Sequence, residues 1–237
     1  PCIMVIEKAP PQRPAQVTQV ESLSFSSLDE YVQSNRYELE IPLLDDAGWS
    51  LADPAVQAVL SKIQAAGKPL GEYAGGKIYY GIKTGLNEAF VIDAETRARL
   101  IEQDPRSAEL IKPFLAGRDI KRYAPPVSEK YLVFTRRGVQ IKKFPAIQAY
   151  LTQYKEQLMP RPKDFIGEWI GRKPGSYQWY EIQDTVEYSP LFEEPKIIIP
   201  AIVQSGSYTL DLNGFYSNDK TSIIASQDLY LLGLLNS

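Results

Sequence analysis

The sequence has no histidine and one cysteine, Cys2. Without histidine the chain lacks the commonest general base, the serine and cysteine catalytic triads, and the ligands of nearly every zinc site. A single cysteine excludes a disulfide framework and a cysteine metal site, and it favours a reducing compartment such as the cytoplasm. Hydrolytic chemistry would therefore have to rest on carboxylates or lysines.

Long apolar runs are also absent. No run approaches the ~18 residues that a membrane helix needs, and no charged-then-apolar signal segment opens the chain. Hydrophobic residues make up 44% and charged residues 23% of the 237 positions, which is ordinary for a soluble globular protein. We expect one large domain or two small ones and no membrane partner.

The two ends of the sequence indicate a piece of a longer protein. Residues 1–8 are typical of a buried strand entered in mid-run, and Pro1 is not an initiator methionine. Residues 228–237 have apolar side chains at helical spacing and stop without a glycine exit. A natural terminus with a frayed helix is the alternative.

Hydrophobic periodicity predicts helices and strands that do not alternate strictly, so the predicted fold class is α+β, with a mixed β-sheet and peripheral helices. The clearest helix starts after Asp53, has Pro54 at its first position and ends at Gly67. Its apolar residues Val56, Val59, Leu60 and Ile63 share one face. Residues 9–16 are predicted as a linker. Further helices are predicted early in 26–44 and at 94–103, 107–115, 144–159 and 228–237. Strands are predicted late in 26–44 and at 77–82, 88–93, 130–138, 139–144, 177–182, 196–203, 208–212 and 221–225.

Charge is unevenly distributed along the chain. The net charge is −3, yet residues 117–173 hold 13 Lys or Arg against 5 Asp or Glu, a balance of +8. Its basic residues cluster on predicted turns, where loop tips could follow a phosphate backbone. A polyanion-binding face and an ordinary solvated surface both fit this charge pattern.

The stretch YQWYEI (177–182) sets aromatic side chains and one amide beside Arg172 and Lys173. Such side chains stack on bases and read base edges in nucleic-acid complexes. Strand alternation would place Gln178 and Tyr180 on one face and Tyr177 and Trp179 on the other. Gln178 is either a base-reading residue or an exposed strand residue.

The loop GIKTG (81–85) is too short for a nucleotide P-loop and is predicted to return into a strand, as a hairpin does. We expect Lys83 and Thr84 to contact a DNA backbone. Asn87 either shapes the turn or reaches a base.

Several stretches in order carry a resemblance: GIKTGLNEAFVID (81–93), IKPFLAGRDIKRY (111–123), YQWYEI, EEPKIIIPAI (193–202) and YSNDKTSIIASQDLYLLGLLNS (216–237). Residues 77–237 thereby resemble the TaqI-like C-terminal specificity domain, the target-recognition domain of adenine-specific DNA methyltransferases and of single-chain type IIG restriction-modification enzymes. The stretch PCIMVIEK resembles the last strand of the preceding methyltransferase domain.

The resemblance implies a domain organisation and a role. Residues 1–16 would be the end of a methyltransferase domain and a linker, 17–76 a connecting α/β segment, and 77–237 the DNA target-recognition domain with a truncated final helix. The Asn-Pro-Pro-Tyr catalytic motif and a glycine-rich S-adenosylmethionine loop are absent from the sequence. The expected function is therefore to choose a double-stranded DNA sequence and position the target adenine for the parent's own methyltransferase domain. S-adenosylmethionine would bind in that parent enzyme, with magnesium if a nuclease is fused to it, and no cofactor or metal in this chain.

Candidate DNA-contacting residues combine basic or amide side chains with predicted loops and strand ends. The residues expected to contact the DNA backbone are Lys83, Thr84, Arg118, Lys121, Arg137, Lys142, Lys143 and Lys173. The residues expected to read bases are Arg136, Gln140, Arg172, Gln178 and Lys220, with Gln183 as a second choice.

Two other classes of function remain open from the sequence. Asp184, Glu194 and Lys196 resemble the acid–acid–lysine pattern of magnesium-dependent nucleases, although Pro195 disturbs the strand that such a site needs. A carbohydrate- or protein-binding module would use the 15 tyrosines but leaves the basic segment unexplained.

Overall fold

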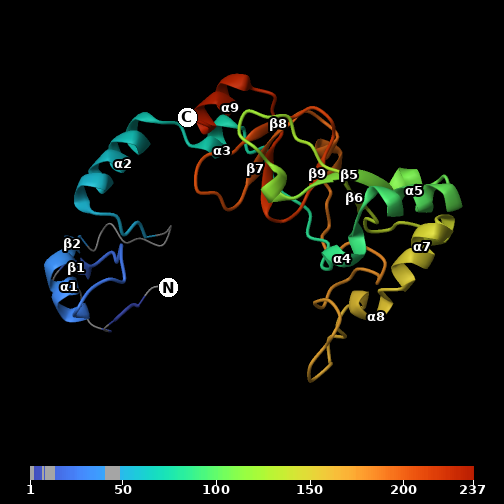
Figure 1. The fold of residues 1–237 in the computed structure, drawn as a ribbon, viewed down its shortest axis with the longest axis horizontal. Coiled ribbons are helices and arrows are strands. Elements are labelled where there is room, and N and C mark those ends of the chain that lie inside the picture. The colour runs from blue at the N-terminus through green and yellow to red at the C-terminus, as the bar shows by residue number, and fades with distance from the viewer. Residues whose placement is uncertain (1–2, 7, 9–13, 41–48) are drawn as a thin grey trace. The chain divides into compact units, whose positions relative to one another are not determined.

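The computed structural model describes residues 3–6, 8, 14–40 and 49–237. Helices and strands occur in mixed order, so the α+β class is confirmed (Figure 1). Contacts within the chain divide it into two compact units, Pro1–Pro69 and Leu70–Ser237, which we call unit 1 and unit 2. No helix in the described ranges is long and apolar enough to cross a membrane.

The described part of unit 1 contains a two-stranded antiparallel sheet and two α-helices. Its elements are β1 (Ala15–Val17), α1 (Leu28–Asn35), β2 (Tyr37–Leu39) and α2 (Pro54–Ala66). As predicted, α2 begins after Asp53, whose carboxylate accepts the N–H groups of Ala55 and Val56, and ends before Gly67. These caps depend only on neighbouring residues, which is why the sequence reveals them.

Two expectations for unit 1 are wrong over the described residues. Residues 1–8 were predicted to form a buried strand, but residues 3–6 form no strand and Val5 is 95% exposed. The sheet described in this unit consists of β1 and β2 and does not include residues 3–6, whose apolar side chains stay exposed. Residues 15 and 16, expected in the linker, belong to β1. The remaining predicted linker residues up to 13, and the end of the 26–44 segment from residue 41, lie outside the described residues.

Unit 2 contains two four-stranded sheets. The antiparallel sheet has the order β3-β10-β7-β8, with β3 (Ile78–Tyr80), β7 (Lys196–Pro200), β8 (Thr209–Asp211) and β10 (Thr221–Ile224). The mixed sheet has the order β4-β6-β5-β9, with β4 (Val91–Ile92), β5 (Ile111–Leu115), β6 (Lys130–Val133) and β9 (Tyr216–Ser217). In the mixed sheet β5 and β9 are parallel, and the other pairs are antiparallel.

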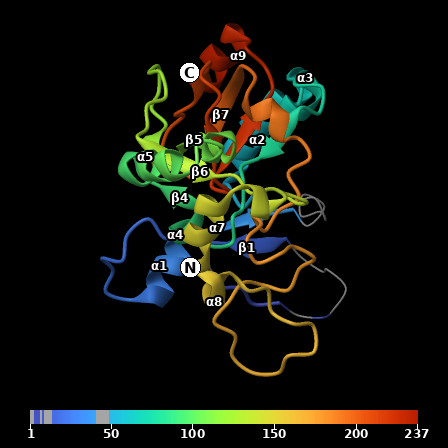
Figure 2. The ribbon, with the colours of Figure 1, turned by 90° about the vertical axis from the view of Figure 1, so that its right-hand side faces the viewer.

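Short helices surround these sheets (Figures 1 and 2). They are α3 (Leu70–Tyr73), α4 (Asn87–Phe90), α5 (Ala94–Gln103), α6 (Ser107–Leu110), α7 (Pro145–Thr152), α8 (Lys155–Leu158) and α9 (Leu229–Leu235), with 3₁₀ turns η2 (Gly117–Asp119), η3 (Ile141–Lys143) and η4 (Ser189–Phe192). One buried cluster joins both sheets and α7, and includes Phe90, Leu132, Ile147, Phe192 and Ile223. This shared core fixes the two sheets relative to each other.

Several predicted elements of unit 2 differ in the structure. The strand predicted at 88–93 is the turn of helix α4 followed by the two-residue β4. The helix predicted at 107–115 ends at Leu110, because Pro113 cannot donate a hydrogen bond inside a helix, and continues as β5. The strand predicted at 139–144 is η3, and the helix predicted at 144–159 is divided into α7 and α8.

Candidate nucleic-acid interface

The loop GIKTG connects the two sheets of unit 2 instead of closing a hairpin, because β3 and β4 belong to different sheets. Gly81 is required by close approach, since a Cβ there would lie 1.8 Å from the carbonyl oxygen of Asn218. The amide of Ile82 donates to the carbonyl of Ser217 at 2.7 Å. At the other end Gly85 has a φ of +85°, a left-handed conformation that favours glycine.

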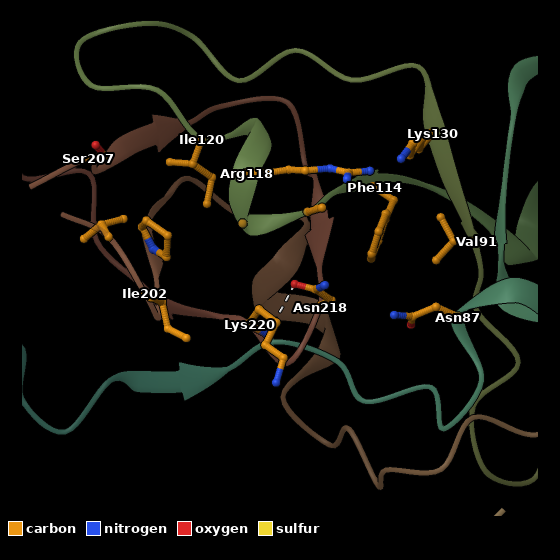
Figure 3. Close-up of a pocket in the computed structure, with 14 residues that line it drawn as sticks. Asn87, Val91, Phe114, Arg118, Ile120, Lys130, Ile202, Ser207, Asn218 and Lys220 are labelled. Carbon is orange, nitrogen blue, oxygen red and sulfur yellow. Dashed lines mark hydrogen bonds between the residues drawn. The ribbon is translucent and has the colours of Figure 1, made fainter. Parts of the chain in front are cut away.

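An open cleft of about 630 Å³ lies between the two sheets beside this loop (Figure 3). Phe114, which is 2% exposed, forms part of its apolar lining. Three cationic side chains line it from three segments: Arg118 on η2, Lys130 at the start of β6 and Lys220 before β10. Asp and Glu do not occur among the described residues that line the cleft.

Arg118 projects from η2 into the cleft (Figure 3). Its side chain is 76% exposed, lies 3.9 Å from the Asp119 carboxylate, and reaches across the cleft toward Lys130 in Figure 3. An exposed pair at this distance contributes little to stability and leaves the guanidinium available to a ligand. The cleft is thus an electropositive surface that suits phosphate oxygens.

Two amide side chains add hydrogen-bonding groups to the same cleft. Asn87 accepts a hydrogen bond at its Oδ1 from the Thr84 hydroxyl, 2.8 Å away, and its amide group faces the cleft in Figure 3. Asn218 accepts the Lys220 amide at its Oδ1 at 3.3 Å. Both amide nitrogens are left to donate outward, as base edges require.

The two loop residues expected to contact DNA differ in exposure. Lys83 is exposed and remains available to a phosphate. Thr84 is only 2% exposed, and its hydroxyl accepts the Leu86 amide while donating to Asn87. Thr84 therefore shapes the loop, and its assignment as a backbone contact is wrong. For Asn87 the structure shows the turn-shaping role, with the amide nitrogen still open.

Arg172 is buried and cannot read a base. It is 4% exposed, and its guanidinium donates to carbonyl oxygens of three segments: Leu158 at the end of α8, Thr84 in the GIKTG loop, and Gln178, Trp179 and Glu181. Burial lowers the pKa of Arg172 to about 10, so it stays charged at neutral pH. The assignment of Arg172 to base reading is wrong because every one of its donor groups is used internally.

Residues 176–183 form a braced turn and not the predicted strand. The Glu181 carboxylate accepts the amides of Gln178 and Gly138 at 2.8 and 2.7 Å. Arg137 is half-buried and donates to Ser176 Oγ at 2.8 Å and to the Gln183 carbonyl at 2.9 Å, so it braces this turn, while its expected contact with a DNA backbone stays a prediction. These side-chain bonds replace the backbone ladder of a strand.

The braced turn presents one exposed amide side chain. Gln178 is exposed, while Tyr177 is 3% exposed and its hydroxyl donates to the Lys173 carbonyl. Trp179 and Tyr180 are half-buried and pack against the core. The braced turn thereby holds Gln178 at a fixed position in solvent. A strand was expected from the sequence to expose this residue, and that strand is not formed.

The other candidates lie at the surface. Arg136 lines a second cavity of about 400 Å³, where Lys112 donates to the Glu193 carboxylate at 2.7 Å and lowers the pKa of Glu193. The remaining exposed candidates are Lys121, Gln140, Lys142, Lys143 and Lys173. The cleft thus contains Arg118 and Lys220 from the predicted set. Lys130 and Asn218 were not identified as site residues from the sequence. A lysine at the start of a strand and an asparagine in a turn do not by themselves indicate that the two line one cleft.

The nuclease alternative does not assemble. Lys196 is fully buried and its ammonium group donates to the Asp211 carboxylate at 2.5 Å, whereas Glu194 is exposed. Burial raises the pKa of Asp184, which accepts the Lys83 amide at 3.3 Å. A lysine locked in a buried ion pair cannot orient water beside two metal-binding acids.

Comparison with protein families decides the relationship. A family model of the TaqI-like C-terminal specificity domain matches residues 112–237, more than half of the chain. The chain belongs to this family. The resemblance inferred from the sequence is thereby confirmed, and the cleft residues Phe114, Arg118, Lys130 and Lys220 all lie inside the matched part of this specificity domain.

A solved structure of the type IIL restriction-modification enzyme MmeI in complex with DNA is similar over 68% of this chain, at 17% identity and a TM-score of 0.46. The chain covers 20% of that enzyme chain. No curated protein matches the sequence.

Proposed function

We propose that unit 2 recognises duplex DNA and selects the sequence at which a catalytic domain outside this chain acts. The observation that carries the proposal is the cleft between the two sheets, where Arg118, Lys130 and Lys220 meet the amides of Asn87 and Asn218. Cations at such a site neutralise phosphates, and amides discriminate base edges. Membership of a specificity-domain family supports the same role.

The catalytic partner in this proposal is an adenine-N6 methyltransferase domain, alone or fused to a restriction endonuclease. S-adenosylmethionine would bind that partner, and magnesium would bind a fused nuclease. The sequence supports this division of labour, because it contains neither an Asn-Pro-Pro-Tyr motif nor a glycine-rich methyl-donor loop. The reaction requires the target adenine to leave the base stack, so the specificity domain would hold the duplex while the catalytic domain takes the base.

The structure modifies which residues we assign to each kind of contact. Thr84 and Arg172 are removed because their polar groups are used inside the protein, and we set Arg137 aside because it braces the turn at residues 176–183. The proposed backbone contacts are Lys83, Arg118, Lys121, Lys130, Lys142, Lys143 and Lys173. The proposed base contacts are Asn87, Arg136, Gln140, Gln178, Asn218 and Lys220.

Salt-dependent binding of the 237-residue chain to a fluorescently labelled duplex tests the proposal. Replacing Arg118 or Lys130 by alanine should each lower the slope of log affinity against log salt by about 1, because each variant releases one fewer counterion. Arg99→Ala is the matched control, since Arg99 is exposed on α5 outside the cleft. An affinity that is insensitive to salt, or a slope that only Arg99→Ala changes, would overturn the proposal.

A further inference from the structure

The loop formed by residues 160–172, which we call the 160–172 loop, follows α8 and projects from the rest of unit 2 (Figures 1 and 2). It is closed at its base by a bridge between Pro160 and Arg172. The amide of Arg161 donates to the carbonyl of Arg172, and the amide of Arg172 donates to the carbonyl of Met159, both at 2.9 Å. The loop therefore leaves and re-enters the fold at one point.

Two isoleucines of this loop lie in solvent. Ile166 is 95% and Ile170 is 76% exposed. Internal contacts order the loop around them: the rings of Phe165 and Trp169 meet edge to face at 5.0 Å, and the Trp169 indole donates to the Met159 carbonyl at 3.1 Å. The exposure of both side chains on an ordered loop makes them available to a partner.

Charged residues near the tip indicate the kind of partner. Arg161 and Lys163 are exposed on the same loop, which lies within the segment of +8 balance. Asp164 and Glu168 offset part of this charge locally, so phosphate attraction alone does not account for the loop. Aliphatic side chains flanked by cations are the means by which proteins insert wedges between base steps.

The base of the loop is connected to two other proposed DNA-facing segments. Arg172 closes the loop, and its guanidinium also binds the carbonyls of Thr84 in the GIKTG loop and of Glu181 in the braced turn. A displacement of the loop would therefore be opposed by the segments that present Lys83 and Gln178. A wedge needs this kind of rigid support to unstack bases.

We propose that the 160–172 loop is a DNA wedge, in which the exposed side chains of Ile166 and Ile170 insert between base pairs and partly unstack them. Arg161 and Lys163 would contact the adjacent phosphates. This inference rests on the proposed DNA-recognition function and adds a site that deforms the duplex. The proposal can be tested without knowing the target sequence, because the free energy of unstacking is lowest at a base pair that is already weakened.

The test compares two duplexes of identical sequence, one fully paired and one with a single central T·T mismatch. The wild-type chain should bind the mismatched duplex about five- to tenfold more tightly, because less unstacking energy is required there. The variant Ile166→Ser/Ile170→Ser should bind both duplexes equally while keeping salt-dependent binding to the paired one. Val127→Ser, which removes a 75% exposed valine outside the loop, should keep the wild-type preference.

Each other outcome has a distinct meaning. Absence of a mismatch preference in the wild type, or its persistence in the isoleucine variant, would overturn the wedge while leaving the proposed function intact. An equal loss on both duplexes would assign the isoleucines to general binding or folding and also overturn it; thermal unfolding by circular dichroism separates those two causes. An unchanged preference with lost association to the parent's catalytic domain would assign the loop to a protein partner. No DNA binding by any variant would overturn both proposals.

Discussion

Removing the buried guanidinium of Arg172 should destabilise unit 2 far more than removing any exposed arginine. The side chain donates to five carbonyl groups. Two of these carbonyls also accept a backbone hydrogen bond. The amide of Gln183 donates to the carbonyl of Thr84, and the amide of Glu181 donates to the carbonyl of Gln178. The carbonyls of Leu158, Trp179 and Glu181 depend on Arg172 among the described residues.

The magnitude follows from those three carbonyls. A buried polar group left without its partner costs about 1–3 kcal/mol, and water entering the vacated space would satisfy part of the set. We therefore expect Arg172→Ala to lower the free energy of unfolding by about 3–5 kcal/mol, as is typical when a buried charged partner is removed. Arg172→Lys should recover only a part, because an ammonium group cannot match a planar fork of donors.

Urea unfolding followed by tryptophan fluorescence measures this loss, with Arg99→Ala as the control expected to change stability by less than about 0.5 kcal/mol. The same variants also test the corrected role of Arg172. Arg172→Lys should not alter the sequence preference of the parent enzyme that we propose beyond what its unfolded fraction explains. A loss below about 1 kcal/mol for Arg172→Ala, or a selective change in base preference for Arg172→Lys, would refute this account.

Three further predictions concern single positions. Gly81→Ala should cost about 1–3 kcal/mol or prevent folding in urea denaturation, because its Cβ would overlap the Asn218 carbonyl. The hydrogen bond from Lys112 lowers the pKa of Glu193 below its ordinary 4.5. The ionised Glu193 carboxylate therefore stabilises the fold above pH 4.5, and this contribution disappears as the pH falls through the folded-state pKa. Glu193→Gln should reduce the loss of unfolding free energy at acid pH, measured by urea denaturation at several pH values. Gln178→Ala should cost about 1–3 kcal/mol on the cognate site and little on random DNA. The measurement is methylation of cognate and single-base-altered duplexes by the parent methyltransferase that we propose, and equal losses would exclude base reading.

Local signals explain which elements the sequence predicts well. Helix starts at Asp53 and Asp93 follow from an acceptor side chain near free amides, and both carboxylates make those bonds. Short elements were predicted less well. The strand expected around Gln178 is replaced by a turn because the side chains of Glu181 and Arg172 bind its backbone, and such side-chain bonds leave no periodic pattern in the sequence.

In the candidate site, too, some residues are predictable from local sequence and others only from the folded structure. The exposure of basic residues such as Arg118 is predictable from the sequence, because charged side chains are seldom fully buried. Arg172 belongs to an equally basic pair with Lys173 and yet is buried. Arg172 differs from Lys173 because carbonyl groups from several segments of the fold surround its guanidinium and accept its hydrogen bonds. The cleft itself depends on how two sheets share a core, which composition cannot reveal.

The most direct test of the central claim is the chemical reactivity of lysines with and without duplex DNA. Acetylation of the 237-residue chain, read residue by residue by mass spectrometry, should be slowed severalfold by DNA at Lys220 in the cleft and at Lys83 on the GIKTG loop. Lys62, exposed on α2 in unit 1, serves as the internal control and should react at the same rate in both samples. Unchanged reactivity of Lys220 and Lys83 under saturating DNA, with protection elsewhere, would contradict DNA recognition through this cleft.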